Sequence, residues 1–139
     1  MGTLRLTDTN VFNRLNVTPM KTILVVDDTP SELELMTRFL KESGFSVIVA
    51  TDAKEAMTKA ADFKPDVVVT DVVMPGMSGF ELCRTLKKNA ATQNMPIIVC
   101  TSKNQDLDRL WGMKQGADVY VTKPFTQDDL VKAVNSVLN

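Results

Sequence analysis

The chain has 139 residues, 44% of them hydrophobic, which is enough for one domain with a hydrophobic core. A formal net charge of −1 with 24% charged residues gives no strong field to attract nucleic acid or an anionic membrane. No apolar run is long enough to span a bilayer, and the N-terminus lacks the apolar segment of a signal peptide. We therefore expect a cytoplasmic protein with no membrane insertion and no direct contact with nucleic acid.

Cysteine and histidine usage narrows the possible chemistry. Cys83 and Cys100 are the only cysteines, and we expect both to be reduced and to face the core. Histidine is absent, which excludes imidazole metal sites, Ser-His and Cys-His nucleophiles, and phosphohistidine on this chain. Any chemistry must use carboxylates, hydroxyls, lysine or a hard metal ion.

Residues 1–19 show neither helical nor strand periodicity. We expect them to form a flexible N-terminal extension, followed by a domain that occupies residues 20–139. A docking segment is the alternative, because Phe12 and Leu15 could pack against the domain.

From Lys21 onward, apolar strands alternate with amphipathic helices. Strands are expected at residues 22–26, 45–50, 97–100 and 119–121, and in the apolar run that begins at Val67 and stops at Asp71. Val67, Val68 and Val69 leave no polar face, as in a strand covered by helices on both sides.

Each strand is followed by a pattern that predicts a helix. The predicted starts are Thr29-Pro30-Ser31-Glu32, Asp52, Ser78-Gly79-Phe80-Glu81, Ser102 to Gln105, and Thr126 to Asp129; the first and third match a capping box. Gly44 suits the end of the first helix, Pro65 follows the second, and Gly116 stops the fourth. Trp111 shares a helical stripe with Leu107 on the fourth helix, so burial is expected, with a partner anchor as the alternative.

Five strands and five helices joined by short loops predict an α/β fold. The expected form is a flavodoxin-like, doubly wound, five-stranded parallel sheet in the order 2-1-3-4-5, as a single domain.

Polar residues stand where the predicted strands end. Asp27 and Asp28 follow the first strand, Asp71 ends the third, Thr101 follows the fourth and Lys123 follows the fifth. The first and third strands are neighbours in this order, roughly 4.8 Å apart, so the three acids should gather at one sheet edge.

Clustered carboxylates repel one another. Two unit charges about 4 Å apart cost about 4 kcal/mol at an effective dielectric constant near 20, so the cluster calls for a cation, a raised pKa, or both. Oxygen ligands with room for water suit Mg²⁺ better than Ca²⁺. Asp71 is then placed as a nucleophile towards a phosphoryl group, with the metal, Lys123 and the Thr101 hydroxyl offsetting the charge.

These residues, together with Met74-Pro75-Gly76 behind Asp71 and Pro124-Phe125 behind Lys123, resemble the receiver domain of two-component response regulators. The likeness covers residues 21–139. It implies phosphotransfer from the phosphohistidine of a histidine kinase to Asp71.

The resemblance also implies roles for individual residues. Asp28, Asp71 and the backbone carbonyl of Val73 would be Mg²⁺ ligands, with Asp27 acting directly or through water. Thr101 would be the switch hydroxyl and Tyr120 the switch aromatic, and packing is the alternative for Tyr120. The Lys123–Pro124 bond would be cis. Phosphorylation would reshape the surface formed by the fourth helix, fifth strand and fifth helix, where a downstream protein would bind.

Two positions near the site vary widely in such families, and here they are Val73 and Lys103. We hypothesise that the apolar Val73 side chain shields the phospho-aspartate and lengthens its lifetime.

The chain ends soon after the fifth helix, so we expect a stand-alone receiver, monomeric or weakly dimeric, that acts through another protein. Residues 108–117 resemble single-domain regulators of twitching or phototactic motility. A small Mg²⁺-dependent aspartyl-phosphate phosphatase or phosphotransferase is the alternative. Such enzymes usually place an acid two residues after the nucleophile, and that position is Val73. A flavodoxin-like FMN protein is rejected because the acidic loop after the first strand would repel phosphate.

Overall fold

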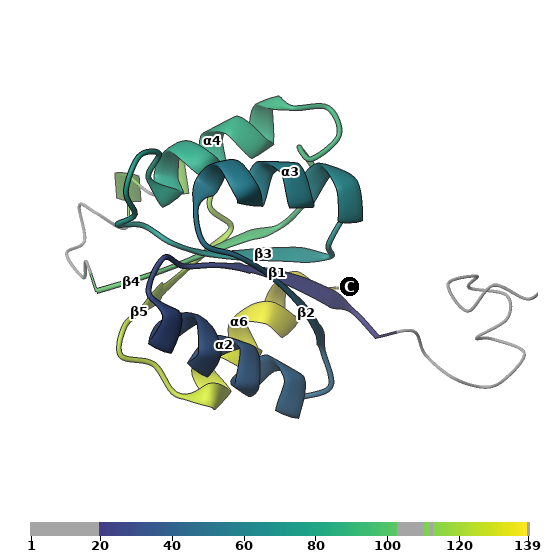
Figure 1. Ribbon diagram of the computed structural model, residues 1–139, viewed down its shortest axis with the longest axis vertical. Helices are drawn as coiled ribbons and strands as arrows, with labels where there is room; N and C mark the ends of the chain where they lie inside the picture. The colour runs from purple at the N-terminus through teal and green to yellow at the C-terminus, as the bar shows by residue number, and fades with distance from the viewer. Residues whose placement is uncertain (1–19, 103–109, 112, 139) are drawn as a thin grey trace, which may run out of the picture.

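A parallel five-stranded sheet forms the centre of the protein (Figure 1). The computed structural model describes residues 20–102, 110–111 and 113–138. The strands are β1 (Thr22–Val26), β2 (Ser46–Ala50), β3 (Val67–Asp71), β4 (Ile97–Thr101) and β5 (Val119–Thr122). Their order is β2-β1-β3-β4-β5, with every pair parallel. The predicted fold class and strand order are therefore confirmed.

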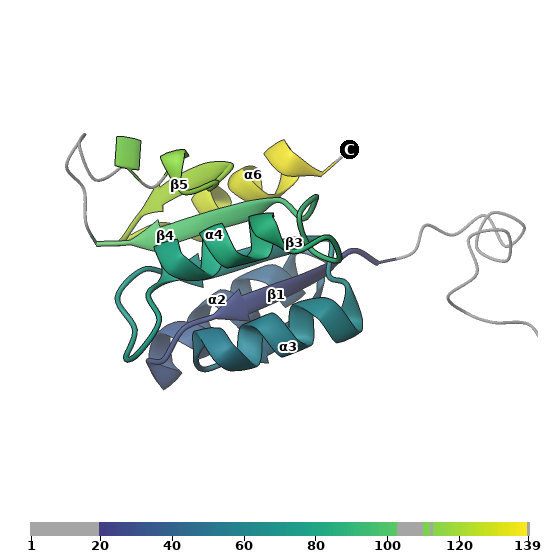
Figure 2. The same cartoon turned by 90° about the horizontal axis from the view of Figure 1, so that it is seen from above.

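Helices cover both faces of this sheet. The helices with defined bounds are α2 (Pro30–Glu42), α3 (Ala53–Phe63), α4 (Gly79–Lys88) and α6 (Gln127–Val137). α2 and α6 pack on one face, and α3 and α4 on the other, as Figures 1 and 2 show. The helix predicted between Ser102 and Gly116 falls largely outside the described residues, although residues 110, 111, 113 and 114 are helical. Residues 1–19 and Lys103 also lie outside them.

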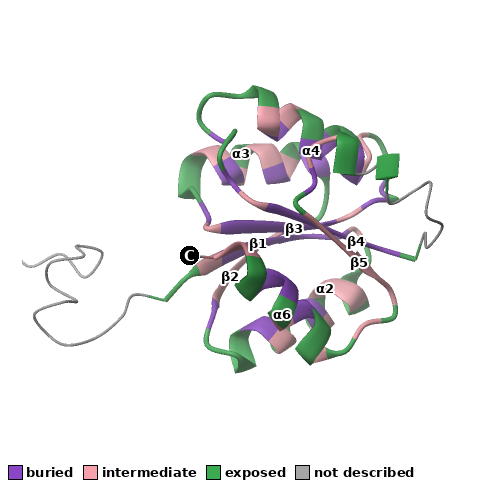
Figure 3. Ribbon diagram, turned by 180° about the vertical axis from the view of Figure 1, so that it is seen from behind, coloured by how far each residue is buried: buried purple, intermediate pink, exposed green. Residues whose placement is uncertain are grey.

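The hydrophobic core has two halves because the strands alternate between the two faces. Ile23 and Val25 of β1 face α2 and α6, whereas Leu24 and Val26 face α3 and α4. All four side chains are fully buried, and so are Val67, Val68 and Val69 of β3. Figure 3 shows the same pattern, with buried positions along the strands and exposed ones on the outer helix surfaces. This rigid centre holds the strand ends in fixed positions.

Both cysteines are buried and unpaired, on opposite faces of the sheet. Burial raises the pKa of the Cys83 thiol and of the Cys100 thiol to about 12. Both thiols are therefore protonated at neutral pH and serve as core packing.

The predicted caps differ in outcome. The side chains of Asp52, Ser78 and Thr126 accept hydrogen bonds from the backbone N–H groups of Glu55, Glu81 and Asp129, as expected. The capping box predicted at Ser78 is only half formed, because the structure records no return bond from the Glu81 side chain. Asp129 also accepts from the N–H of Thr126, which completes a capping box.

The capping box predicted at the start of α2 is wrong. The Thr29 side chain makes no cap hydrogen bond. The Thr29 N–H, which Glu32 would bind in such a box, donates instead to Oδ1 of Asp27 at 3.0 Å. Because Asp27 accepts the Thr29 N–H, the Glu32 side chain is available to another partner.

The predicted burial of Trp111 is also wrong. Trp111 is 47% exposed and Leu110 is 55% exposed. The Trp111 ring packs edge-on against Phe80 of α4, with ring centroids 4.7 Å apart and an interplanar angle of 81°. The helix containing Trp111 precedes the edge strand β5, where less apolar surface is available than over the central strands.

Among the residues described, no helix combines the length and apolar character that crossing a membrane requires.

The two threonine N-caps give a matched pair for testing helix capping. Thr126→Ala should lower the free energy of unfolding by about 1 kcal/mol, because it removes a side-chain cap. Thr29→Ala should cost only a few tenths of that, because its side chain bonds no helical N–H. Urea denaturation of the two variants measures both values, and equal losses would contradict this account.

Candidate functional site

Three of the polar residues predicted at the strand ends, Asp27, Asp71 and Lys123, share one face because of the two-residue strand period. Asp27 continues the row of Ile23 and Val25, and Asp71 continues the row of Val67 and Val69. Lys123 continues the row of Val119 and Val121 on β5, and its backbone N–H donates to the carbonyl of Thr101 at 2.9 Å. All three rows lie on the face covered by α2 and α6. Regular strand geometry therefore directs two acids and one lysine to a common point.

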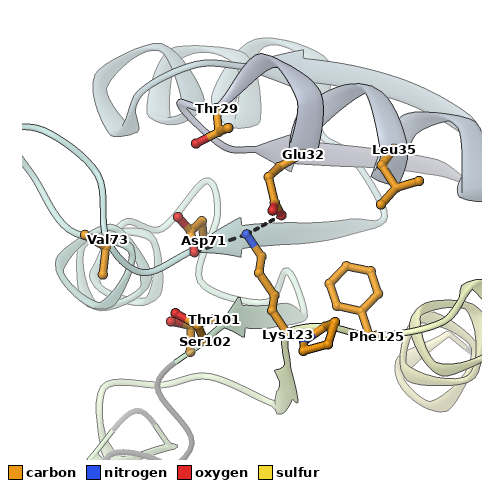
Figure 4. Close-up of a pocket in the computed structure, with 10 residues that line it drawn as sticks. Thr29, Glu32, Leu35, Asp71, Val73, Thr101, Ser102, Lys123 and Phe125 are labelled. Atoms are coloured by element: carbon orange, nitrogen blue, oxygen red, sulfur yellow. Dashed lines mark ion pairs between the residues drawn. The ribbon is translucent and has the colours of Figure 1, made fainter.

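Lys123 joins the strand ends. Its ammonium nitrogen Nζ lies 3.0 Å from Oδ2 of Asp27 and 3.5 Å from Oδ1 of Asp71. The same nitrogen lies 2.8 Å from Oε2 of Glu32, in the first turn of α2. Figure 4 shows the Lys123 side chain reaching between Asp71 and Glu32. One cation thus contacts three carboxylates, which come from the loop after β1, from β3 and from α2.

These contacts decide the protonation state of Lys123. Burial alone would lower the pKa of its ammonium group. The hydrogen bonds to Glu32 and Asp27 and the nearby charge of Asp71 outweigh burial and raise the pKa above its ordinary value. Lys123 is therefore charged throughout the neutral range.

Asp27 is the most constrained of the acids. Its side chain is completely buried, and both of its oxygens accept hydrogen bonds, Oδ1 from the N–H of Thr29 and Oδ2 from Lys123. Asp28 is more exposed than Asp27. The acidic pair therefore contains one fixed carboxylate and one that is open to solvent.

Asp71 is in a strained electrostatic position. Burial raises the pKa of its carboxyl group above the ordinary value, Lys123 works against this, and the charge of Asp27 adds to the increase. The Asp71 side chain is only 13% exposed, yet it faces a pocket. A bound cation, or a reaction that removes its negative charge, would therefore stabilise this carboxylate.

The pocket in front of Asp71 has a volume of about 410 Å³. Its lining brings together the three strand ends and the start of α2 (Figure 4); the residues are Thr29, Glu32, Leu35, Asp71, Val73, Thr101, Ser102, Lys123, Pro124 and Phe125. Val73 is 61% exposed and presents an apolar side chain beside Asp71. The Lys123–Pro124 peptide bond is cis, as the resemblance implied.

Thr101 and Tyr120 belong to the other face of the sheet. Thr101 continues the row of Ile97 and Val99 on β4, and Tyr120 pairs with Val99 and packs against the core half beneath α3 and α4. Thr101 is 1% exposed and still lines the pocket, while Tyr120 is half-buried. A hydroxyl at the pocket and an aromatic ring thus stand on the same side of neighbouring strands.

Gly79 fixes how closely α4 approaches the site. A Cβ atom at this position would lie 1.9 Å from the backbone oxygen of Asp71, closer than any side chain allows. The Gly79 N–H donates to the carbonyl of Val72 at 2.9 Å. The start of α4 is therefore seated directly on the backbone of the pocket acid, and only glycine fits there.

Sequence reasoning missed Glu32 as a site residue. It treated this side chain as part of a helix cap, because the spacing from Thr29 matched that pattern. The only sequence signal for a site role was the position of Glu32 one helical turn beyond the acidic pair.

The donor set fits a hard divalent cation. Asp27, Asp28 and Asp71 each offer an oxygen, and these atoms lie within 4.8 Å of one another. Oxygens bound to one Mg²⁺ lie about 2.1 Å from the ion, so small side-chain rotations bring this set into range. Within the described residues, Lys123 is the cation that contacts these acids, and its ammonium group faces three carboxylates, which also favours a metal.

Comparisons with known proteins agree with this geometry. The sequence profile of the response regulator receiver domain matches residues 23–135. Protein PilH of Pseudomonas aeruginosa is 43% identical over 119 residues, which cover 86% of this chain and 98% of PilH. The DNA-binding response regulator MtrA of Mycolicibacterium smegmatis is 40% identical over 116 residues, which cover 84% of this chain and half of MtrA. The crystal structure of chemotaxis protein CheY4 of Vibrio cholerae superimposes with a TM-score of 0.82 at 32% identity, over 86% of this chain and all of CheY4.

Removing the charge of Asp71 should stabilise the metal-free protein. We expect Asp71→Asn to raise the free energy of unfolding by about 1 kcal/mol at pH 7, the size usual for relieving an unfavourable functional group. Because the folded-state pKa of Asp71 is raised, the folded state holds its proton to higher pH than the unfolded state. Wild-type stability relative to the variant should therefore fall as pH rises through that raised pKa, and the difference should vanish at pH values below both pKa values. Urea denaturation in chelator from pH 3 to pH 7 measures this.

Asp62→Asn is the matched control, since Asp62 is exposed at the far end of α3. It should leave the free energy of unfolding unchanged. An Asp71→Asn variant less stable than wild type would show that the Lys123 contact outweighs the cost of burial.

Proposed function

This chain belongs to the response regulator receiver domain family, and we propose that it accepts a phosphoryl group on Asp71 from the phosphohistidine of a histidine kinase. The observation that carries the proposal is the position of Lys123, whose ammonium group contacts both Asp27 and Asp71 across the ends of three strands. A fixed positive charge beside a largely buried carboxylate that faces a pocket is what phosphoryl transfer needs.

The proposed reaction exchanges one bond for another. An Oδ atom of Asp71 attacks phosphorus, the phosphorus–nitrogen bond of the phosphohistidine breaks, and its electron pair stays on the imidazole. Lys123 donates a hydrogen bond to a phosphoryl oxygen, and the Thr101 hydroxyl donates from the other side of the pocket. The pocket admits a small donor or the imidazole of a partner because Asp71 faces its interior.

The acids are proposed to hold Mg²⁺, which would neutralise charge on the transferring phosphoryl group. Asp28, Asp71 and the backbone carbonyl of Val73 are the proposed direct ligands. Asp27 is proposed to act through a metal-bound water, and its two oxygens already accept hydrogen bonds from Thr29 and Lys123, which supports the indirect role.

Thr101 and Tyr120 are proposed as the switch. A phosphoryl group adds negative charge and acceptor oxygens, so the Thr101 hydroxyl would move towards it and leave space for the Tyr120 ring. Their common side on neighbouring strands supports this coupling. The surface formed by residues 110–111 and 113–114, β5 and α6 would then change shape and bind a downstream protein.

We propose that this output serves motility or taxis in the cytoplasm, through a monomer or weak dimer. The structural relative CheY4 is named as a chemotaxis protein, which supports the choice. Turnover of small phosphate esters is the alternative. It lacks support because the position two residues after Asp71 holds Val73, which offers no general acid.

Phosphorylation should be confined to Asp71. With Mg²⁺ and acetyl phosphate, intact-mass spectrometry should detect one added phosphoryl group on wild-type protein and on Asp62→Asn, and none on Asp71→Asn. Chelation of Mg²⁺ should reduce the modification at least tenfold, since the metal offsets charge in the transition state. Label on the Asp71→Asn variant would overturn the assignment, and rapid release of phosphate from an ester substrate would favour the enzyme.

Val73 should affect how long the phospho-aspartate lasts. Its exposed apolar side chain stands at the pocket, where it offers no hydrogen bond to an attacking water. We expect Val73→Asn to shorten the lifetime several-fold, because an amide can orient that water. The decay of phosphorylated protein measures this, with Val73→Ala as the control for side-chain size. Equal lifetimes in wild type and Val73→Asn would refute a shielding role.

A further inference from the structure

We propose that Glu32 is a positioning residue that holds the Lys123 ammonium group before phosphorylation and releases it to the phosphoryl group. By its charge it also opposes the binding of phosphoryl anions and favours the binding of Mg²⁺. The inference rests on the function proposed above, and it concerns a residue of α2 that lies outside the strand ends.

Glu32 makes the shortest of the three Lys123 contacts. The distance from Lys123 Nζ to Glu32 is 2.8 Å, shorter than the 3.0 Å to Asp27 and the 3.5 Å to Asp71. An ammonium group has three hydrogens, and three carboxylates surround it. A phosphoryl oxygen that needs a hydrogen bond from Lys123 must therefore displace or weaken one of these contacts.

The contact between Lys123 and Glu32 is easier to break than the contact with Asp27. Asp27 is fully buried and also bound to the Thr29 N–H, so losing Lys123 would leave a buried charge without its counter-ion. The Glu32 side chain is 42% exposed and has solvent beside it. Glu32 can return to water at small cost, so it is the partner that exchanges with the phosphoryl group.

Glu32 faces the pocket because its usual hydrogen-bond donor is already taken. It occupies the position of a capping-box acid, but Asp27 already accepts from the N–H that such an acid would bind. The same hydrogen bond that orders the loop after β1 therefore sends the Glu32 carboxylate to Lys123. Its place in the site follows from this local competition for one donor.

The charge of Glu32 acts with opposite sign on the two ligands of the pocket. It adds to the negative field of Asp27, Asp28 and Asp71, which strengthens attraction for Mg²⁺. It repels a phosphoryl dianion and competes for the cation that would bind it. A residue that merely supported the fold would not shift the two affinities in opposite directions.

Glu32→Gln tests this, because it keeps the size and an acceptor oxygen while removing the charge. Glu34→Gln is the matched control: Glu34 lies on the same helix, is exposed, and does not line the pocket. Two titrations at low ionic strength are needed, one with Mg²⁺ alone and one with beryllofluoride at saturating Mg²⁺, both read by calorimetry on the full chain.

In Glu32→Gln we expect beryllofluoride to bind about two- to fivefold more tightly and Mg²⁺ to bind more weakly by a similar factor. Both changes should shrink in 0.5 M salt, and Glu34→Gln should behave as wild type. Unchanged or weaker beryllofluoride binding in Glu32→Gln would overturn the proposal, and so would equal shifts in Glu34→Gln.

The Mg²⁺ titration separates this proposal from the broader one. Wild-type protein that binds Mg²⁺ but no beryllofluoride would refute the phosphoacceptor function. Unchanged Mg²⁺ affinity in Glu32→Gln would refute the role of Glu32, whatever the outcome with beryllofluoride.

Discussion

The ion-pair cluster around Lys123 is the interaction on which the site depends. Residues 96 positions apart in the sequence meet there, because Lys123 closes β5 and Asp27 follows β1. One ammonium group against Asp27, Glu32 and Asp71 leaves the cluster with excess negative charge. That excess is unfavourable without a bound cation. Under the function proposed above, it would favour both Mg²⁺ binding and phosphorylation of Asp71, so stability and reactivity would depend on the same few contacts.

The sheet makes this arrangement possible at low conformational cost. Each strand alternates between two buried faces, so its last residue has a fixed orientation before any site contact forms. Asp27, Asp71 and Lys123 lie on the sheet face covered by α2 and α6. Thr101 and Tyr120 lie on the opposite face. The site thus spans both layers of helices, which gives a change at Asp71 a physical route to either side of the molecule.

Strand-end residues were predictable from the sequence, whereas helix-borne partners were not. Asp27, Asp71 and Lys123 each follow an apolar run, and the strand order then determines their proximity. The partner of Glu32 depends on which acceptor captures the Thr29 N–H, and a spacing rule does not contain that information. The prediction that Trp111 is buried was wrong for a similar reason. Helical periodicity predicts which residues share a stripe, but not how much apolar surface lies beneath that stripe at the sheet edge. Local sequence patterns predicted the strands, most of the helices and their buried faces. Competition between tertiary contacts decided the partner of Glu32 and the exposure of Trp111.

Gly79 shows how a residue without functional groups can limit what natural variation is possible here. Its missing side chain lets the first turn of α4 rest against the backbone oxygen of Asp71. Any side chain at this position would push the start of α4 away from Asp71, although Gly79 carries no functional group of its own. Intolerance of substitution at position 79 would reflect a lack of space for one added carbon atom. The positions that tolerate no substitution therefore need not be the positions that react.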